Sequence, residues 1–408
     1  MRQSAFRRFF AAGVFGSIGQ RMWLFAVPLA AIGPLGASAF QVGLLTALAN
    51  AAVVAFSLPL GVWIDRSAPR RRLIASGLVR AAVVVSVPLA WWADALSYWH
   101  LAAVVFASGA LDLLYQTSRQ SLLPPLVGRP RLVEANARLE AVNQTTSLGG
   151  PALAGQMVAI LSTPVTMLAG AVSMAASSIA VAAIPASAAD TDEKPDGRGD
   201  AASRSFRRDM AEGMRFVLGE PVLRVLASSN LLANSAVFMF GSVQVYYLAH
   251  SLGMGPGQIG VLLSAGGAGG VAGAFTARKI AARLGQGPAM AAALVLFAPC
   301  SAMLPLTTGA STAALGGAGL AGMMFFAVVY NVAQVSTRQA ITPPRLLGRV
   351  NATFRFATGI MAVAGALVGG AIAEAVDART ALWTSTALGF TACLPVLLSP
   401  VRRLRQLP

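Results

Sequence analysis

Hydrophobic and polar positions alternate along this chain in long blocks. No Asp, Glu, Lys or Arg occurs in residues 22–64, 141–189, 225–277 or 284–337. A helix needs roughly 20 apolar residues to cross a bilayer, so each block has room for two crossings and predicts a helical hairpin. Glycine, proline or short polar residues near the middle of each block mark the turn between its two helices.

Shorter apolar stretches at 73–92, 99–118, 356–376 and 381–400 predict further crossings. The expected fold is therefore all-α: a polytopic membrane protein of about 12 transmembrane helices. Composition agrees, because 56% of the 408 residues are hydrophobic and only 11% are charged. A soluble protein of this length would need far more polar surface.

One polar segment, residues 189–220, separates the first six predicted helices from the last six. It is rich in Asp, Gly, Lys and Arg and ends in a short amphipathic run at 206–218. We expect a cytoplasmic linker with a short amphipathic helix. The linker divides an N-terminal six-helix bundle at 1–188 from a C-terminal six-helix bundle at 221–408.

The two halves share short sequences in register. Gln41-Val42-Gly43 returns as Gln258-Ile259-Gly260, and Thr117-Ser118-Arg119-Gln120 is similar to Ser336-Thr337-Arg338-Gln339. Two six-helix pseudo-repeats with a binding site near the membrane midplane are typical of secondary transporters.

The positive charges indicate the orientation in the membrane. With the amino terminus inside, every Lys and Arg except Arg21, Arg80 and Arg379 falls in a segment on the cytoplasmic side. Basic residues are retained on that side, so we expect a multi-pass protein of the cytoplasmic (inner) membrane with both termini cytoplasmic. The net charge of +16 then reflects topology and contact with anionic lipids, and it requires no nucleic-acid partner.

The sequence carries no pattern of an enzyme. Intramembrane catalysis would need a paired nucleophile and base, or His and carboxylates at ligand spacing. His100 and His250 lie near predicted helix ends, and Cys300 and Cys393 lie inside apolar helices. We expect no cofactor and no metal site.

Several motifs resemble a known family. Gly61-Val62-Trp63-Ile64-Asp65-Arg66 followed by Arg70-Arg71-Arg72 resembles the loop 2–3 signature of the major facilitator superfamily, with Ala68-Pro69 where the family usually has Gly. The strings beginning at Leu123-Pro124-Pro125 and Leu347-Gly348-Arg349 resemble the branch of the enterobactin exporter and macrolide efflux proteins. The resemblance covers essentially the whole chain.

The resemblance implies a secondary active transporter that works by alternating access. It favours proton-coupled efflux of a small amphipathic molecule such as a drug, a siderophore or a secondary metabolite. The alternatives are an uptake permease of the same fold and, in another class, a membrane-embedded enzyme or scaffold. The expected partners are this small-molecule substrate, protons and the lipid bilayer, and we expect a functional monomer.

The loop 2–3 motif is a candidate gating latch made of Gly61, Asp65, Arg66 and Arg119. Asp65 at the end of a helix can face the positive end of another helix. The second half has Ala282 in place of Asp65, so the latch would be one-sided. The plainer interpretation is that the neighbouring arginines only set topology.

Gly150, Pro151 and Gly155 resemble the antiporter motif of exporters in this superfamily that exchange a drug for a proton. Small residues allow close helix approach, and proline opens a bend. Thr146 replaces a family glycine, and ordinary helix packing is the alternative role.

Arg21 and Asp112 are ionisable residues at membrane depth, where such residues usually face a cavity or a partner. Counting about 1.5 Å per residue, they differ in depth by about 9 Å, so direct pairing is marginal. Asp112 is the candidate proton carrier, with Arg21 as its neighbour, because burial and a nearby arginine shift a carboxyl pKa in opposite directions. A static structural pair and a position near the cytoplasmic surface are the alternatives.

Polar and aromatic residues at mid-depth are candidates for a substrate cavity. They are Gln20, Phe25, Tyr115, Gln116, Asn230, Asn234, Phe238, Gln244, Tyr330, Asn331 and Gln334. For any single Asn or Gln, a hydrogen bond between helices is the alternative role. The sequence does not identify the substrate.

Overall fold

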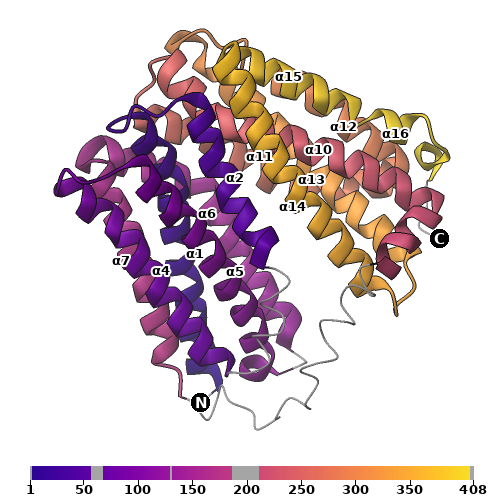
Figure 1. Cartoon of the computed structure of the whole chain (residues 1–408). Coiled ribbons are helices and arrows are strands. Elements are labelled where there is room, and N and C mark those ends of the chain that lie inside the picture. Colours follow the sequence, from indigo (N-terminus) through magenta and orange to yellow (C-terminus); the bar gives the residue numbers. More distant parts are fainter. Residues whose placement is uncertain (1, 57–67, 129–130, 186–210, 405–408) are drawn as a thin grey trace. The chain divides into compact units, whose positions relative to one another are not determined.

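The computed structural model describes residues 2–56, 68–128, 131–185 and 211–404 (Figure 1). Within these ranges all regular secondary structure is helical. The first half contains α1 (Arg2–Ile32), α2 (Ala39–Phe56), α4 (Pro69–Trp92), α5 (Tyr98–Val127), α6 (Leu132–Leu161) and α7 (Thr163–Ala182). The second half contains α10 (Pro221–Tyr246), α11 (Pro256–Leu284), α12 (Gln286–Ala302), α13 (Ala313–Ile341), α14 (Leu347–Ala375), α15 (Ala378–Thr391) and the short α16 (Leu394–Leu397).

The predicted all-α polytopic fold is confirmed. Among the described residues, 10 helices are long and apolar enough to cross a membrane. Two further helices complete the expected series: α12 is apolar but only 17 residues long, and the first turns of α6 carry Glu134, Arg138 and Glu140.

The chain forms two compact units. One comprises Met1–Ala37 and Leu48–Ala202, and the other comprises Ser38–Ala47 and Ser203–Pro408. The first turns of α2 therefore group with the second unit, where the backbone N–H of Phe40 donates to the Glu374 carboxylate of α14 (3.3 Å). Most of the predicted linker lies outside the described residues, although residues 211–219 are helical.

Helix packing repeats between the units. In the first unit α1 packs against α6 and α7, and α4 packs against α5 and α7. In the second unit α10 packs against α14 and α15, and α12 packs against α13 and α15. The same pairs occur at corresponding places in each half, as two related six-helix repeats require.

Glycines permit the closest of these approaches. A Cβ atom on Gly19 of α1 would lie 2.6 Å from the backbone oxygen of Gly170 of α7. A Cβ atom on Gly269 of α11 would lie 1.8 Å from the backbone oxygen of Ala321 of α13. Contact of this kind lets membrane helices associate through van der Waals packing.

The helix ends follow from local sequence. Proline occupies the first turn of α4, α7, α10 and α11, where its missing N–H costs nothing. Ser97 caps α5 by accepting from the backbone N–H of His100 (3.2 Å), and Asp377 caps α15 by accepting from that of Thr380 (2.7 Å). Pro69, the departure from the loop 2–3 signature, therefore begins α4.

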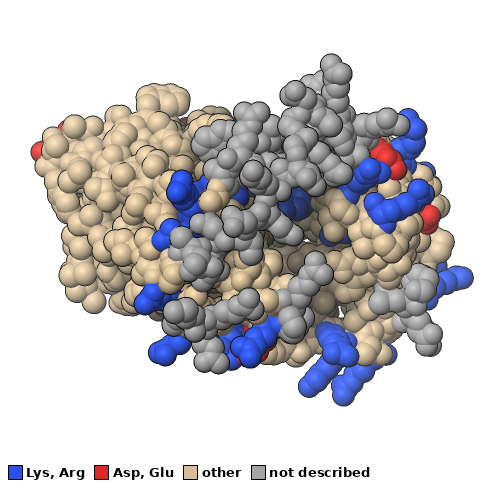
Figure 2. Space-filling view, turned by 90° about the horizontal axis from the view of Figure 1, so that it is seen from below, with Lys and Arg blue, Asp and Glu red and all other residues tan. Residues whose placement is uncertain are grey.

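Basic residues gather at one end of the helices in each unit. In the first unit they lie at the start of α4 and α6 and near the end of α5, and in the second they lie near the start of α10 and α14 and the end of α11. Figure 2 shows Lys and Arg side chains exposed in the view from below.

Candidate functional site

A cavity of about 240 Å³ lies within the first unit, among α1, α4, α5, α6 and α7. Its lining combines small, polar and charged side chains. They are Gly13, Gly16, Ser17, Gln20, Arg21, Leu24, Gly77, Arg80, Asp112, Tyr115, Gln116, Arg119, Asn143, Met174 and Ser177.

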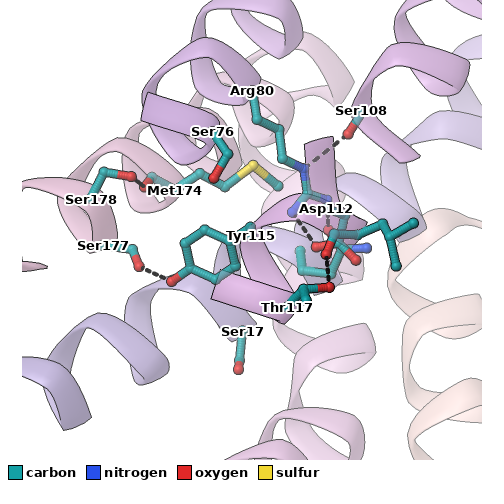
Figure 3. Close-up of polar contacts among 12 residues, drawn as sticks. Ser17, Ser76, Arg80, Ser108, Asp112, Tyr115, Thr117, Met174, Ser177 and Ser178 are labelled. Atoms are coloured by element: carbon teal, nitrogen blue, oxygen red, sulfur yellow. Dashed lines mark hydrogen bonds and ion pairs between the residues drawn. The ribbon is translucent and has the colours of Figure 1, made fainter. Parts of the chain in front are cut away.

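An ion pair between α4 and α5 forms one wall of this cavity (Figure 3). A guanidinium nitrogen of Arg80 lies 2.5 Å from Asp112 Oδ1. The Arg80 side chain is only 5% exposed, whereas that of Asp112 is 26% exposed. The carboxylate is thus the more accessible member of the pair.

Two neutral side chains complete the surroundings of the Arg80 guanidinium. Its Nε donates to Ser108 Oγ (3.0 Å), and a terminal nitrogen donates to Gln20 Oε1. Ser108 and Asp112 are four residues apart on α5, so they share one helix face. Arg80 therefore joins α1, α4 and α5 through three acceptors, and a buried cation requires such partners.

A second hydrogen-bond chain links α5, α7 and α1 at the lining of the cavity. Ser177 of α7 donates to the backbone oxygen of Ala12 (2.7 Å) and so accepts from the Tyr115 hydroxyl, 2.7 Å away. A Cβ atom on Gly16 would lie 3.1 Å from each of these two hydroxyl oxygens. Because Gly16 has no side chain, the Tyr115 hydroxyl has room to lie against α1.

Arg21 points into the same cavity but does not pair with Asp112. Its guanidinium donates to Ser147 Oγ of α6. A Cβ atom on Gly150 would lie 2.8 Å from Arg21 Cβ and 2.9 Å from Arg21 Cγ. Gly150, expected as a helix-packing residue, thus makes room for the stem of Arg21, while Pro151 is half-buried and Gly155 is buried.

Arg119 lines the cavity one turn beyond Tyr115 on α5. Among the described residues, no carboxylate forms an ion pair with Arg119 or Arg21. Arg119 was expected in the gating latch, whose other members, Gly61, Asp65 and Arg66, lie outside the described residues.

The structure thus brings together six of the residues that the sequence selected. They are Gln20, Arg21, Asp112, Tyr115, Gln116 and Arg119. Phe25 is buried in α1 and does not line the cavity.

The other predicted cavity residues belong to the second unit. Asn230, Asn234, Phe238 and Gln244 lie on α10, and Tyr330, Asn331 and Gln334 lie on α13. Asn230 Oδ1 accepts from the Thr358 hydroxyl (3.1 Å), and the Asn234 amide donates to the Asn230 backbone oxygen (2.8 Å). Asn230 thus makes an interhelical hydrogen bond, the alternative role, whereas the bond of Asn234 is local to α10.

Sequence reasoning missed the partner of Asp112. Arg80, like Arg21, stands inside an apolar helix, and this was the signal that could have identified it. Ser108 and Ser147 gave no signal, because serines are frequent in membrane helices. Among the residues that the structure describes, no group of three or more His, Cys, Asp or Glu could hold a metal ion.

Comparison with known proteins places this geometry among transporters. A family model for the Major Facilitator Superfamily matches residues 9–340 and 226–407. Multidrug efflux pump Tap of Mycobacterium tuberculosis is 27% identical over 257 residues, which are 61% of this chain and 59% of that protein. Tap of Mycolicibacterium fortuitum is 28% identical over 207 residues, 48% of this chain and 49% of that one. The chain thus aligns with about half to three fifths of the length of these curated relatives.

Solved structures agree on the fold. A bacterial homologue of the iron transporter ferroportin in an inward-facing state has a TM-score of 0.75 at 16% identity, covering 97% of this chain and 98% of that one. The nucleoside transporter NupG has a TM-score of 0.76 at 10% identity, with 97% and 98% covered. At these identities the likeness extends to the fold alone.

Proposed function

The chain belongs to the Major Facilitator Superfamily, and from this premise we propose that it exports a small amphipathic molecule in exchange for protons. It is a multi-pass membrane transporter rather than an enzyme, as the family and the relatives indicate. The proposal concerns the direction of transport, the coupling ion and the residues that carry them.

The ion pair of Arg80 and Asp112 in a cavity within the helix bundle is the observation that carries the proposal. An ionisable residue at membrane depth is costly and usually has a functional partner. Asp112 is the accessible member, so a proton can reach it without the helices separating. Protonation would remove its attraction to Arg80, whose guanidinium would keep Ser108 and Gln20 as acceptors.

This pair can couple two events. With Asp112 ionised, the pair ties α4 to α5, and with Asp112 protonated the tie loses its charge. Alternating access needs the helices to adopt two arrangements. Proton binding shifts the equilibrium between the two arrangements by the difference between the free energies with which the proton binds to each. Proton entry in one arrangement and release in the other would drive substrate in the opposite direction.

Similarity to the Tap proteins, named as multidrug efflux pumps, supports export. The distribution of basic residues supports a cytoplasmic location of both termini in the inner membrane. Gating by Asp65 and Arg66 and function as a monomer belong to the same proposal.

Accumulation in cells that lack their own pumps tests the proposal. Cells expressing the chain are exposed to a panel of amphipathic drugs, siderophores and metabolites, with and without an uncoupler. We expect lower accumulation of at least one compound and its recovery when the uncoupler is added. Higher accumulation would indicate uptake, and accumulation that the uncoupler leaves unchanged would contradict proton coupling.

A further inference from the structure

The cavity of the first unit has an excess of positive charge. Among the described residues, its lining contains three guanidinium groups, from Arg21, Arg80 and Arg119, and one carboxylate, from Asp112, which gives these residues a net charge of +2. Asp112 forms an ion pair with Arg80. Of the described residues, none offers a carboxylate in ion-pair contact to Arg21 or Arg119, although Arg21 donates to Ser147.

The guanidinium groups of Arg21 and Arg119 line the cavity without a carboxylate partner among the described residues, and Arg21 lies at membrane depth, so the site favours an anion as ligand. A charged side chain at membrane depth carries a large free-energy cost unless an opposite charge or a polar cavity compensates it. Arginine is also the side chain whose planar fork best matches carboxylate and phosphate oxygens. A cationic ligand would meet only Asp112, whose charge Arg80 already balances.

Both arginines line the cavity beside glycines. The stem of Arg21 lies against Gly150, where any side chain would displace it. A guanidinium nitrogen of Arg119 lies 4.0 Å from the position that a Cβ atom on Gly13 would take. Gly150 on α6 thus leaves the space for the Arg21 stem, whereas a Cβ atom on Gly13 of α1 would lie at ordinary van der Waals distance from the Arg119 guanidinium.

The size of the cavity indicates how much of a ligand it holds. Pockets for whole drug-sized molecules span roughly 300–1,000 Å³, whereas this one measures about 240 Å³. Ser17, Gln116 and Asn143 add neutral polar groups to its lining. Such a space suits the charged head of an amphipathic molecule rather than the whole of it.

The geometry points to an anion-binding subsite in which Arg21 and Arg119 hold a carboxylate or phosphate group of the substrate. This inference rests on the proposed export function and names its substrate class: amphipathic organic anions. Anion binding and proton binding use different groups, because the proton binds Asp112 while Arg21 and Arg119 bind the ligand.

Binding of three molecules of nearly one shape to the purified full-length chain tests the subsite. Naphthoate is an anion, naphthamide is its neutral counterpart, and naphthylmethylammonium is a cation. Titration calorimetry in phosphatidylcholine nanodiscs should show naphthoate binding at least about tenfold more tightly than either, since each charge-assisted hydrogen bond is roughly twice as strong as a neutral one. Equal affinities for naphthoate and naphthamide would overturn the inference, and this comparison needs no variant.

Variants then locate the subsite. Arg21→Gln and Arg119→Gln should each reduce the preference for naphthoate over naphthamide by about threefold or more. Arg138→Gln is the matched control, because Arg138 pairs with Glu134 on the exposed face of α6. A preference that survives the double substitution of Arg21 and Arg119 would overturn their assignment.

Nanodiscs with phosphatidylglycerol separate a soluble anion from a lipid headgroup. The affinity for naphthoate should differ by less than about threefold between phosphatidylglycerol and phosphatidylcholine nanodiscs. Strong competition between phosphatidylglycerol and naphthoate would assign the subsite to the lipid headgroup and overturn the substrate class. Uncoupler-sensitive export without any anion preference would overturn this inference alone. Anion preference without uncoupler-sensitive export of any compound would overturn the proposed function and leave the subsite standing.

Discussion

Arg119 and Arg338 occupy the same place in the two sequence repeats but have different surroundings. Arg119, in the first unit, faces a cavity that also contains Arg21, Arg80 and Asp112. Arg338, in the second unit, lies over the ring of Phe354, with its guanidinium carbon 4.4 Å from the ring centroid. An aromatic face partly compensates the charge of a cation.

The residues one turn before Arg338 and Arg119 also differ between the two units. Gln334, one turn before Arg338 on α13, is fully buried, and neither of its amide atoms has a hydrogen-bond partner among the described residues. In the first unit the corresponding turn holds Tyr115, which bonds to Ser177 beside the cavity. Under the proposed mechanism the first repeat provides chemistry and the second provides packing, so substitutions should affect transport in the first unit and stability in the second.

Asp112→Asn should have the largest effect. The amide keeps the size of the side chain but neither binds the coupling proton nor balances Arg80, so we expect uncoupler-sensitive export to fall at least about tenfold. Accumulation in cells measures it. Glu134→Gln is the control, since Glu134 belongs to an exposed pair with Arg138 on α6. Full export by Asp112→Asn would remove Asp112 from the mechanism.

Arg80→Lys should have a smaller effect. An ammonium group keeps the charge but cannot reach Ser108, Asp112 and Gln20 in one planar arrangement. Losing one or two of these hydrogen bonds should cost about 1–3 kcal/mol of stability, with export reduced but not abolished. Thermal unfolding measures the change in stability, and accumulation in cells measures the change in export. Unchanged stability would mean that the three contacts of Arg80 do not hold α1, α4 and α5 together.

Gly150→Ala and Gly149→Ala form a matched pair in α6. A Cβ atom on Gly150 would meet the stem of Arg21, whereas one on Gly149 meets nothing within 4 Å. Both gain about 1 kcal/mol of helix propensity, but only Gly150→Ala displaces Arg21, and overpacking costs about 1–3 kcal/mol. Export should fall for Gly150→Ala alone, and equal behaviour of the two variants would contradict the role of Gly150.

Gln334→Leu should have the smallest effect on transport. Replacing a buried amide that lacks partners with an apolar side chain of similar size should leave stability unchanged or raise it by about 1 kcal/mol. Export should remain within about twofold of the unsubstituted chain. A loss of export with stability retained would show that the second unit also contributes chemistry.

The number and order of the helices could be predicted because bilayer thickness dictates them. Blocks without charge had to hold about 20 residues per crossing, and the described helices occupy these blocks. The chemistry at Asp112 was predictable in part. Its position inside a membrane helix was visible in the sequence, but counting residues along the chain gave only its depth and not the side of the helix on which a partner lies.

The side-chain contacts of the site depend on how each helix is rotated about its own axis, which the sequence does not show. Arg80 lies beside Asp112 because α4 and α5 are adjacent and turn these faces to each other. Gly150 was recognisable as a small residue, but its contact with Arg21 depends on how α1 and α6 meet. Asn230 was selected for its polarity, yet its amide oxygen accepts from Thr358.

Proton movement in proteoliposomes tests the central claim most directly. The full-length chain is reconstituted with a pH-sensitive dye inside, and a compound that the accumulation screen identifies as a substrate is added to one side. The account predicts that substrate drives proton movement in the opposite direction, and that Asp112→Asn abolishes this movement while Glu134→Gln retains it. Substrate transport without proton movement, or proton movement unchanged by Asp112→Asn, would contradict it.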